Sequence, residues 1–297
     1  MLTFAVMKQL LFTLITIICC ACSSTRCGYV ATSGGGRIFY EERGKGDAVL
    51  LLHGHSLDRR MWDDQWTVLG KHFRTIRMDF RGYGQSSDQH ESLQMTHADD
   101  VLTLMDTLHI RQAHVVGLSM GAFVAGDLLA MHPERLLSCT MASGGIRNSK
   151  GPSEPMDSAE SLKRDKEIAA LRVKGVEQMK REWTEQLIAS GGSHRERMRT
   201  ALNRMITEWT AWQPLHKEVR LFYGREAWQR LRQRGMVSVP TLMIRGANEL
   251  KGKQAKPREL SFTSNGRYIV IDDCGHMLNM ERPHEFNAAL IQFLLSK

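Results

Sequence analysis

The chain has 297 residues, of which 42% are hydrophobic and 24% are charged. This composition excludes a disordered or collagen-like polymer, and the length suffices for one large domain with a substantial core. The formal net charge is +8, but basic and acidic residues are mixed along the chain, without a long block of lysine and arginine. Nucleic-acid binding therefore gains little support from the charge, and we expect no nucleic-acid partner.

The N-terminal segment predicts export. Leu10 to Ala21 carries no charge and follows Lys8. It is shorter than the roughly 20 residues that span a bilayer, but it is typical of the apolar core of a signal peptide. Read from Met7, the segment MKQLLFTLITIICCAC resembles a bacterial lipoprotein signal, and this resemblance implies cleavage after Ala21 and a lipid on Cys22. An ordinary cleaved signal, or an overlong start before a cytosolic protein, is the alternative.

These features divide the N-terminal region into a signal peptide over residues 1–21 and a flexible tether over 22–35. They predict an exported lipoprotein held at a membrane surface, on its periplasmic or cell-surface side, through Cys22. The cysteines that follow, Cys27, Cys139 and Cys274, lack the CxxC spacing of a metal site. We expect them to be small buried residues or a free thiol, and we expect no metal.

Continuous apolar runs recur along the chain and predict strands buried on both faces. A strand RIFYEE at 37–42 lies between turns, and AVLLLH follows at 48–53. Similar runs occur at 73–80, 113–119, 136–143, 240–246 and 267–273. Segments with helical spacing lie between or after these runs, at 61–70, 93–108, 121–131 and 283–295. Alternating strands and helices predict an α/β fold with a mostly parallel sheet and helices on both faces, formed by residues 36–145 and 236–297.

Residues 146–235 interrupt this alternation and show no buried-strand run. The segment holds 19 lysines and arginines against 12 acidic residues, and four of the six tryptophans: Trp183, Trp209, Trp212 and Trp228. We predict a helical cap inserted over the sheet. The tryptophans either line an apolar acyl pocket or pack the cap helices onto the core.

The sequence Gly117-Leu118-Ser119-Met120-Gly121 has the context of a nucleophile elbow. It follows a β-branched strand and opens a helix of small residues. A strand that turns sharply into a helix leaves no room for side chains two residues on either side of the nucleophile, and the turn exposes the serine hydroxyl. Ser119 is therefore the candidate nucleophile, although a GxSxG motif also occurs by chance.

A serine hydroxyl needs a base to take its proton, and the base needs an acid to fix its tautomer. His276 comes directly after the last expected strand, where a loop histidine can reach the carboxyl edge of the sheet. Glu249 leaves the preceding strand, which gives the chain order Ser, acid, His. Asp272 and Asp273 compete for the acid role, but they lie so close to His276 in sequence that we expect them to cap its loop.

The oxyanion of acyl transfer needs hydrogen-bond donors that are already in place. The backbone N–H groups of Met120, directly after the nucleophile, and of His55, after His53-Gly54, are the candidates. His53-Gly54 alone is also typical of a turn that ends a strand.

With these residues in view, the chain resembles the α/β-hydrolase fold superfamily, in its capped esterase, lactonase and haloperoxidase-like branch. The motifs that carry the resemblance are HGHSLDRRMWDDQ, DFRGYGQSS, GLSMG, RGANE and CGHMLNMERPHEF. The resemblance implies Ser119 as nucleophile, Glu249 as acid, His276 as base, and the N–H groups of His55 and Met120 as oxyanion donors. It also implies that Asp79 and Arg81 hold loops together.

Two positions depart from the family pattern. Aspartate is usual where Glu249 stands, and an apolar residue is usual at His55, whose imidazole can bind substrate or point to solvent.

The leading hypothesis is a serine hydrolase that cleaves small carboxylic esters or lactones through an acyl-enzyme, without a metal or organic cofactor. Ser119 at the elbow, in place of aspartate, argues against dehalogenase or epoxide-hydrolase chemistry. A carbon–carbon bond hydrolase or an iminopeptidase with the same three residues stays open, as does a non-catalytic ligand-binding lipoprotein.

Overall fold

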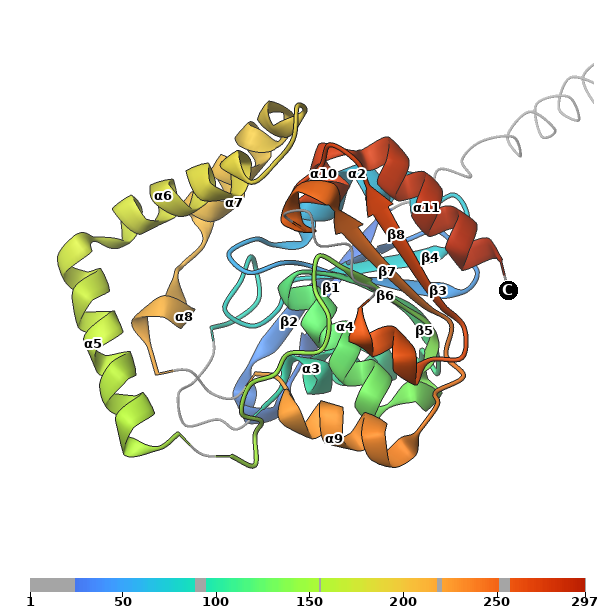
Figure 1. The fold of residues 1–297 in the computed structure, drawn as a ribbon, viewed down its shortest axis with the longest axis horizontal. Helices are drawn as coiled ribbons and strands as arrows, with labels where there is room; N and C mark the ends of the chain where they lie inside the picture. Colours follow the sequence, from blue (N-terminus) through green and yellow to red (C-terminus); the bar gives the residue numbers. More distant parts are fainter. Residues whose placement is uncertain (1–24, 89–94, 155, 218–220, 251–256, 297) are drawn as a thin grey trace, which may run out of the picture.

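The computed structural model describes residues 25–88, 95–154, 156–217, 221–250 and 257–296. Its strands form an eight-stranded sheet in the order β1-β2-β4-β3-β5-β6-β7-β8 (Figure 1). They are β1 (Arg26–Ala31), β2 (Arg37–Arg43), β3 (Ala48–Leu52), β4 (Arg74–Met78), β5 (Ala113–Leu118), β6 (Leu136–Ala142), β7 (Thr241–Gly246) and β8 (Gly266–Ile271). Strand β2 is antiparallel to both neighbours, and β3 to β8 run parallel. The predicted α/β fold with a mostly parallel sheet is confirmed.

The strands at the centre of the sheet are apolar on both faces because helices cover both. Every residue of β3 and of β5 is buried, so neither strand shows the alternation of a half-exposed strand. One face packs against α3 (His97–Thr107), α4 (Met120–Met131) and α9 (Arg225–Arg234). The other packs against α2 (Asp63–Leu69), α10 (Leu278–Glu281) and α11 (Pro283–Leu295). The carboxyl ends of the parallel strands therefore form one accessible edge, where α/β proteins place their ligand sites.

The predicted tether over residues 22–35 is wrong at 26–31. These residues form β1, which pairs antiparallel with β2, and Val30 is buried in the core. The glycines between β1 and β2 make the turn that joins the two strands, in which Gly34 takes a positive φ of 77°. The predicted signal peptide and Cys22 lie outside the described residues. Among the described helices, none combines the length and the apolar character that crossing a bilayer requires.

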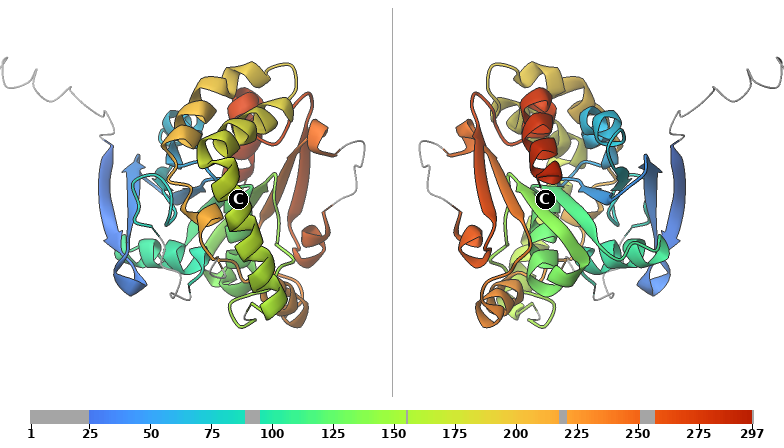
Figure 2. Two further views of the ribbon diagram at one scale, coloured as in Figure 1. Left: turned by 90° about the vertical axis from the view of Figure 1, so that its left-hand side faces the viewer. Right: turned by 90° about the vertical axis from the view of Figure 1, so that its right-hand side faces the viewer.

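Between β6 and β7, the described residues form helices joined by loops, without a strand of the sheet. It contains α5 (Ser158–Lys174), α6 (Val176–Ala189), α7 (Arg199–Glu208), α8 (Trp212–Leu215) and α9. Helices α6 and α7 pack together, and Leu187, Leu202 and Ile206 join the apolar cluster of α2, α10 and α11. Figures 1 and 2 show α5 and α8 arching away from the sheet. Helix α9 instead returns below α4, where Ala227 and Leu231 belong to the core cluster on that face.

Asp127 of α4 is buried where α9 begins, and it makes the stability of the fold depend on pH. Its Oδ2 accepts a hydrogen bond from the N–H of Tyr223 (2.8 Å), while its Oδ1 has no partner among the described residues. Burial raises the pKa of Asp127 to about 8, far above the value of about 3.9 in an unfolded chain. The folded state keeps this proton after the unfolded state has lost it. The free energy of unfolding therefore falls as the pH rises between these two values.

Asp127→Asn should remove this pH-dependent loss, because the amide oxygen still accepts from Tyr223 while the charge is gone. We expect the stability of the variant, relative to the original protein, to grow by up to roughly 1.4 kcal/mol per pH unit between pH 5 and 8. Urea unfolding at several pH values measures the difference. If the free energies of unfolding of the two proteins changed with pH in the same way between pH 5 and 8, Asp127 would already be ionised in the folded state.

Candidate active site

Ser119 lies at the sharp turn between β5 and α4. Its backbone has φ 54° and ψ −111°, a conformation that is rare for a residue with a side chain and that marks a strained turn. Its N–H donates to the carbonyl of Ala142 at the end of β6 (2.9 Å), which fixes the turn against the neighbouring strand. The side chain is half-buried. The hydroxyl therefore stands at the edge of the sheet, at the N-terminus of α4.

The glycines on either side of Ser119 are required by close backbone contacts. A Cβ at Gly117 would overlap the carbonyl oxygen of Gly121, and a Cβ at Gly121 would overlap that of Leu52 in β3. Both obstacles are backbone atoms, which cannot rotate away as a side chain can. The GxSxG spacing is thus needed for strand and helix to approach each other so closely at Ser119.

Glu249 and His276 come together beside this turn. Glu249 lies in the 3₁₀ turn Ala247–Leu250 directly after β7, and His276 in the loop after β8. The Nδ1 atom of His276 lies 2.5 Å from the Oε1 of Glu249. An ionised carboxylate can only accept, so Nδ1 carries the proton and Nε2 is left as the basic nitrogen.

The environment of Glu249 keeps this carboxylate ionised. Burial would raise its pKa, but the hydrogen bond and charge of His276, together with the hydrogen bond from the Ser143 hydroxyl, lower it below its ordinary value. The Oγ of Ser143 donates to Oε2 at 2.6 Å. The side chain thus has a fixed partner on each of its two oxygens.

Ser119 occupies the same edge of the sheet as Glu249 and His276. Ser119 and Ser143 follow the neighbouring strands β5 and β6, and the N–H of Ser143 donates to Ile244 of β7 (2.9 Å). In the described part of the chain, no hydrogen bond joins the Ser119 hydroxyl to His276. Such a bond is often long in a hydrolase without substrate and shortens in the complex.

The loop after β3 lies directly against Ser119. A Cβ built on Gly54 would stand 3.6 Å from the Cβ of Ser119. The next N–H along the chain is that of His55, and neither it nor the N–H of Met120 has a partner in the described regions. Two free backbone donors thus flank the nucleophile, as stabilisation of an oxyanion requires.

The two histidines of this loop differ in their surroundings. His53 is fully buried; its Nε2 accepts from the N–H of Phe80 (3.0 Å), so its Nδ1 donates to the carbonyl of Gly54 (2.8 Å). His55 keeps an exposed surface, and its Nδ1 lies 2.8 Å from the hydroxyl of Tyr83. Removal of water by the surrounding protein, with smaller contributions from His53 and from the positive charge of Arg147, lowers the pKa of His55 to about 4. Its imidazole is therefore neutral at physiological pH.

The four tryptophans of the insertion fill different roles. Trp209 lies edge-on to His55 (5.0 Å between ring centroids), and Trp183 donates from Nε1 to the Oγ of Ser56 (2.7 Å). Both therefore contact the loop that carries the candidate oxyanion donor. Trp212 stacks on His216, and Trp228 packs against Phe262. Two of the tryptophans face the site, and the other two pack elsewhere.

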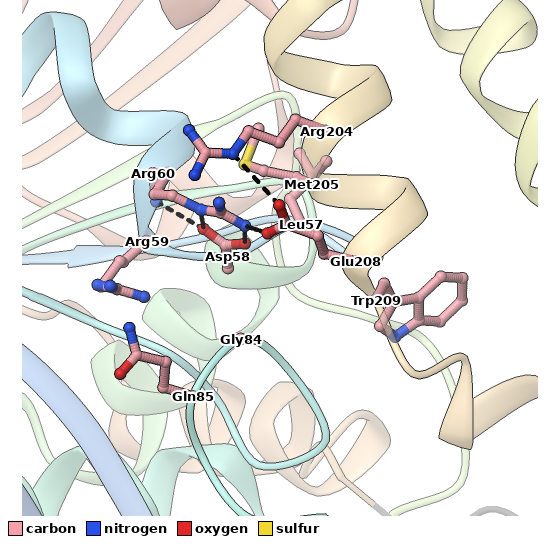
Figure 3. Close-up of a pocket in the computed structure, with 10 residues that line it drawn as sticks. All are labelled: Leu57, Asp58, Arg59, Arg60, Gly84, Gln85, Arg204, Met205, Glu208 and Trp209. Carbon is pink, nitrogen blue, oxygen red and sulfur yellow. Dashed lines mark hydrogen bonds and ion pairs between the residues drawn. The ribbon is translucent and has the colours of Figure 1, made fainter.

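A pocket of about 320 Å³ lies next to this loop, between it and α7 (Figure 3). The residues around it are Leu57, Asp58, Arg59, Arg60, Gly84, Gln85, Arg204, Met205, Glu208 and Trp209. Arg60 pairs with both Asp58 and Glu208, which joins the loop to α7. Neither Ser119 nor His276 lines this pocket, and its link to the candidate site is Trp209, which also contacts His55.

The turn between α6 and α7 is fastened to the loops that carry Glu249 and His276. Buried Glu281 accepts from the N–H of Gly192 in this turn (2.5 Å) and from the N–H of Gly275 beside His276 (2.8 Å). Asp273 accepts from the N–H of Ser193 (2.8 Å). Asp273 therefore anchors the insertion to the histidine loop, while among the described carboxylates it is Glu249 that hydrogen-bonds the imidazole of His276.

Asp79 and Arg81 hold loops together, as the resemblance implied. Asp79 accepts from the N–H and the guanidinium of Arg59 (both 2.8 Å) and from the N–H of Gln85 (2.9 Å). Arg81 forms a buried ion pair with Asp100 at the start of α3. These contacts fix the loop before the 3₁₀ turn Arg59–Trp62 and the loop after β4.

Sequence reasoning missed Ser143 as a partner of Glu249. The turn after β6 holds no carboxylate before Glu154, so it offers no candidate acid, and Ser143 is not itself an acid. The detectable signal was position: β6 and β7 are neighbouring parallel strands, so a hydroxyl at the end of one can reach a carboxylate at the end of the other.

Comparisons with known proteins agree with this architecture. A model of the alpha/beta hydrolase fold family matches residues 47–283. The chain is 28% identical to BpoC of Mycobacterium tuberculosis, named among the non-heme bromoperoxidases, over 86% of this chain and 97% of that protein. It is 27% identical to the 2-hydroxy-6-oxo-6-phenylhexa-2,4-dienoate hydrolase of Comamonas testosteroni, over 86% and 91% of the two chains.

A solved structure also agrees with this architecture. The thermophilic esterase of Thermogutta terrifontis superposes with a TM-score of 0.67 at 25% identity, covering 91% of this chain and 98% of that one. The match of the family model spans most of the chain, and the sheet order, the strained serine turn and the Glu249–His276 pair accompany it. The chain belongs to the α/β-hydrolase fold family.

Proposed function

We propose that this hydrolase cleaves carboxylic esters or lactones through an acyl-enzyme on Ser119, with His276 as base and Glu249 as acid. The observation that carries the proposal is the 2.5 Å contact between His276 Nδ1 and Glu249 Oε1 beside a serine held at positive φ. This contact leaves Nε2 of His276 basic, as abstraction of a hydroxyl proton requires.

The reaction follows from these positions. The Oγ of Ser119 attacks the carbonyl carbon while Nε2 of His276 takes the hydroxyl proton. The oxyanion that forms accepts hydrogen bonds from the N–H groups of Met120 and His55. When it collapses, the alcohol leaves with the proton from His276. Water, activated by the same imidazole, then hydrolyses the acyl group from Ser119.

Each supporting residue has a separate part in this scheme. Glu249 holds the tautomer of His276 and stabilises the imidazolium, and Ser143 holds the second oxygen of Glu249.

The esterase and the dienoate hydrolase among the related proteins support hydrolytic chemistry for this chain. A carbon–carbon bond hydrolase with the same three residues is the alternative, and a panel of esters, lactones and dienoates distinguishes the two.

Labelling with a fluorophosphonate tests the proposal, because this reagent phosphonylates an activated serine. We expect the protein to be labelled, Ser119→Ala to lose the label, and Cys274→Ala to keep it. The cysteine variant is a suitable control because Cys274 is buried and neighbours the catalytic loop without a role in the scheme. Absence of label on well-folded protein would argue for a ligand-binding role without turnover.

We further propose that the protein is exported and anchored through a lipid on Cys22, with the insertion over residues 146–235 acting as a cap. Anchoring and hydrolysis are compatible, since a lipid at the N-terminus leaves the carboxyl edge of the sheet free for substrate.

A further inference from the structure

Arg147 is an exposed arginine that lies on aromatic rings next to the nucleophile helix. It follows β6 by five residues, and its guanidinium carbon lies 5.8 Å from the ring centroid of Phe123 and 5.2 Å from that of Phe222. No ion pair involves Arg147 within the regions that the structure describes, and its side chain is exposed. The charge is thus held in place by ring faces and has no counter-ion.

The position of Phe123 places this charge near Ser119. Phe123 is one helical turn beyond Ser119, and its N–H donates to the Ser119 carbonyl (3.1 Å). Four residues of helix correspond to about 6 Å along the axis. The residues on either side of Arg147 in the chain, Ile146 and Asn148, line a second cavity of about 220 Å³ beside Trp228, distinct from the pocket of Figure 3. Arg147 lies between these two residues in the chain but does not line that cavity, and its guanidinium lies over the rings of Phe123 and Phe222.

The positive charge of Arg147 acts on His55, in the loop after β3. After burial and His53, its positive charge is the next cause that lowers the pKa of His55. Two carboxylates that contact the segment between β6 and Arg147 already have hydrogen-bond partners: Glu249 binds His276 and Ser143, and Glu259 accepts from the N–H of Ile146 (3.2 Å). Among the described residues, no ion pair joins Arg147 to a carboxylate, so its guanidinium can bind a carboxylate of a ligand.

We propose that Arg147 binds a carboxylate carried by the substrate, so that the preferred substrates are anionic esters or lactones, such as monoesters of short dicarboxylic acids. This inference rests on the hydrolase function proposed above. A guanidinium that lies on ring faces still presents N–H groups at its edge, and these fit the two oxygens of a carboxylate. The net charge of +8 adds a general attraction for anions at low ionic strength.

The test compares two substrates that differ only in charge: mono-4-nitrophenyl glutarate and the same molecule with its free carboxylate capped as a methyl ester. We expect the protein to favour the anion by at least about tenfold in kcat/KM. Arg147→Gln should reduce this preference about 10- to 100-fold, mainly through KM, and Arg147→Lys should retain part of it. Arg172→Gln, an exposed arginine of α5, is the matched control and should leave the preference unchanged.

A binding measurement separates recognition from turnover. In Ser119→Ala protein, calorimetric titration with glutarate should give an affinity that falls at least about tenfold when Arg147→Gln is added. Equal affinities, or equal preferences with and without Arg147, would overturn the role of Arg147. Hydrolysis that depends on Ser119 but shows no preference for the anion would refute the substrate class alone. Loss of both hydrolysis and fluorophosphonate labelling would instead refute the proposed function.

Discussion

Ser119→Ala is expected to lower kcat for an activated ester by about 10⁴- to 10⁶-fold, because the hydroxyl that forms the acyl-enzyme is removed. The fold should remain intact, since no described hydrogen bond depends on the Ser119 side chain and alanine tolerates the space. Initial rates of 4-nitrophenol release, with circular dichroism as a control for folding, measure the effect.

A loss of less than tenfold in Ser119→Ala would show that another group carries the reaction. Cys274→Ala is the matched control, because Cys274 lies two residues before His276 and its loss should change kcat little. The contrast between these variants separates loss of the nucleophile from disturbance of the histidine loop.

Glu249→Gln is expected to lower kcat by about 10³- to 10⁴-fold while the fold is retained. The amide has nearly the shape of the carboxylate, but it carries no charge to stabilise the imidazolium, and its N–H₂ group can bind Nδ1 and favour the wrong tautomer. Because the pKa of Glu249 lies below its ordinary value, the carboxylate stays ionised above about pH 5. The loss should therefore persist across the neutral range.

Ser143→Ala is the matched control for Glu249→Gln. It removes the bond of 2.6 Å to Oε2 but leaves the contact with His276 in place. We expect a loss of about 10- to 100-fold, as for one hydrogen bond to a charged group. Equal losses in Ser143→Ala and Glu249→Gln would mean that orientation of Glu249, more than its charge, supports catalysis.

The sheet and the serine turn could be predicted because their signals are local. AVLLLH and AHVVGLS are continuous apolar runs, and burial on both faces of a parallel strand demands that pattern. The GxSxG motif is likewise local in sequence, and the structure explains its glycines by backbone contacts of Gly117 with Gly121 and of Gly121 with Leu52 of β3. Glu249 could be predicted as the acid from chain order, from its place just after a strand, and because Asp272 and Asp273 lie too close to His276 in sequence. In the structure Glu249 contacts His276.

The features that escaped prediction depend on pairing between distant segments. Strand β1 is an edge strand with mixed burial, so RCGYVA shows neither an apolar run nor clean alternation. Ser143 matters only because β6 lies next to β7. The guanidinium of Arg147 lies over the ring of Phe222, which is 75 residues further along the chain. Phe222 packs beside α4 only in the folded chain, so the sequence does not show this contact.

Rapid-quench mass spectrometry gives the most direct test of covalent catalysis by Ser119. The protein is mixed with a slowly deacylating 4-nitrophenyl ester, quenched in acid within the burst of nitrophenol release, and digested. We expect a mass increase of one acyl group on the peptide that contains Ser119, and none in Ser119→Ala. Steady turnover without this adduct, or an adduct on a different residue, would contradict the mechanism.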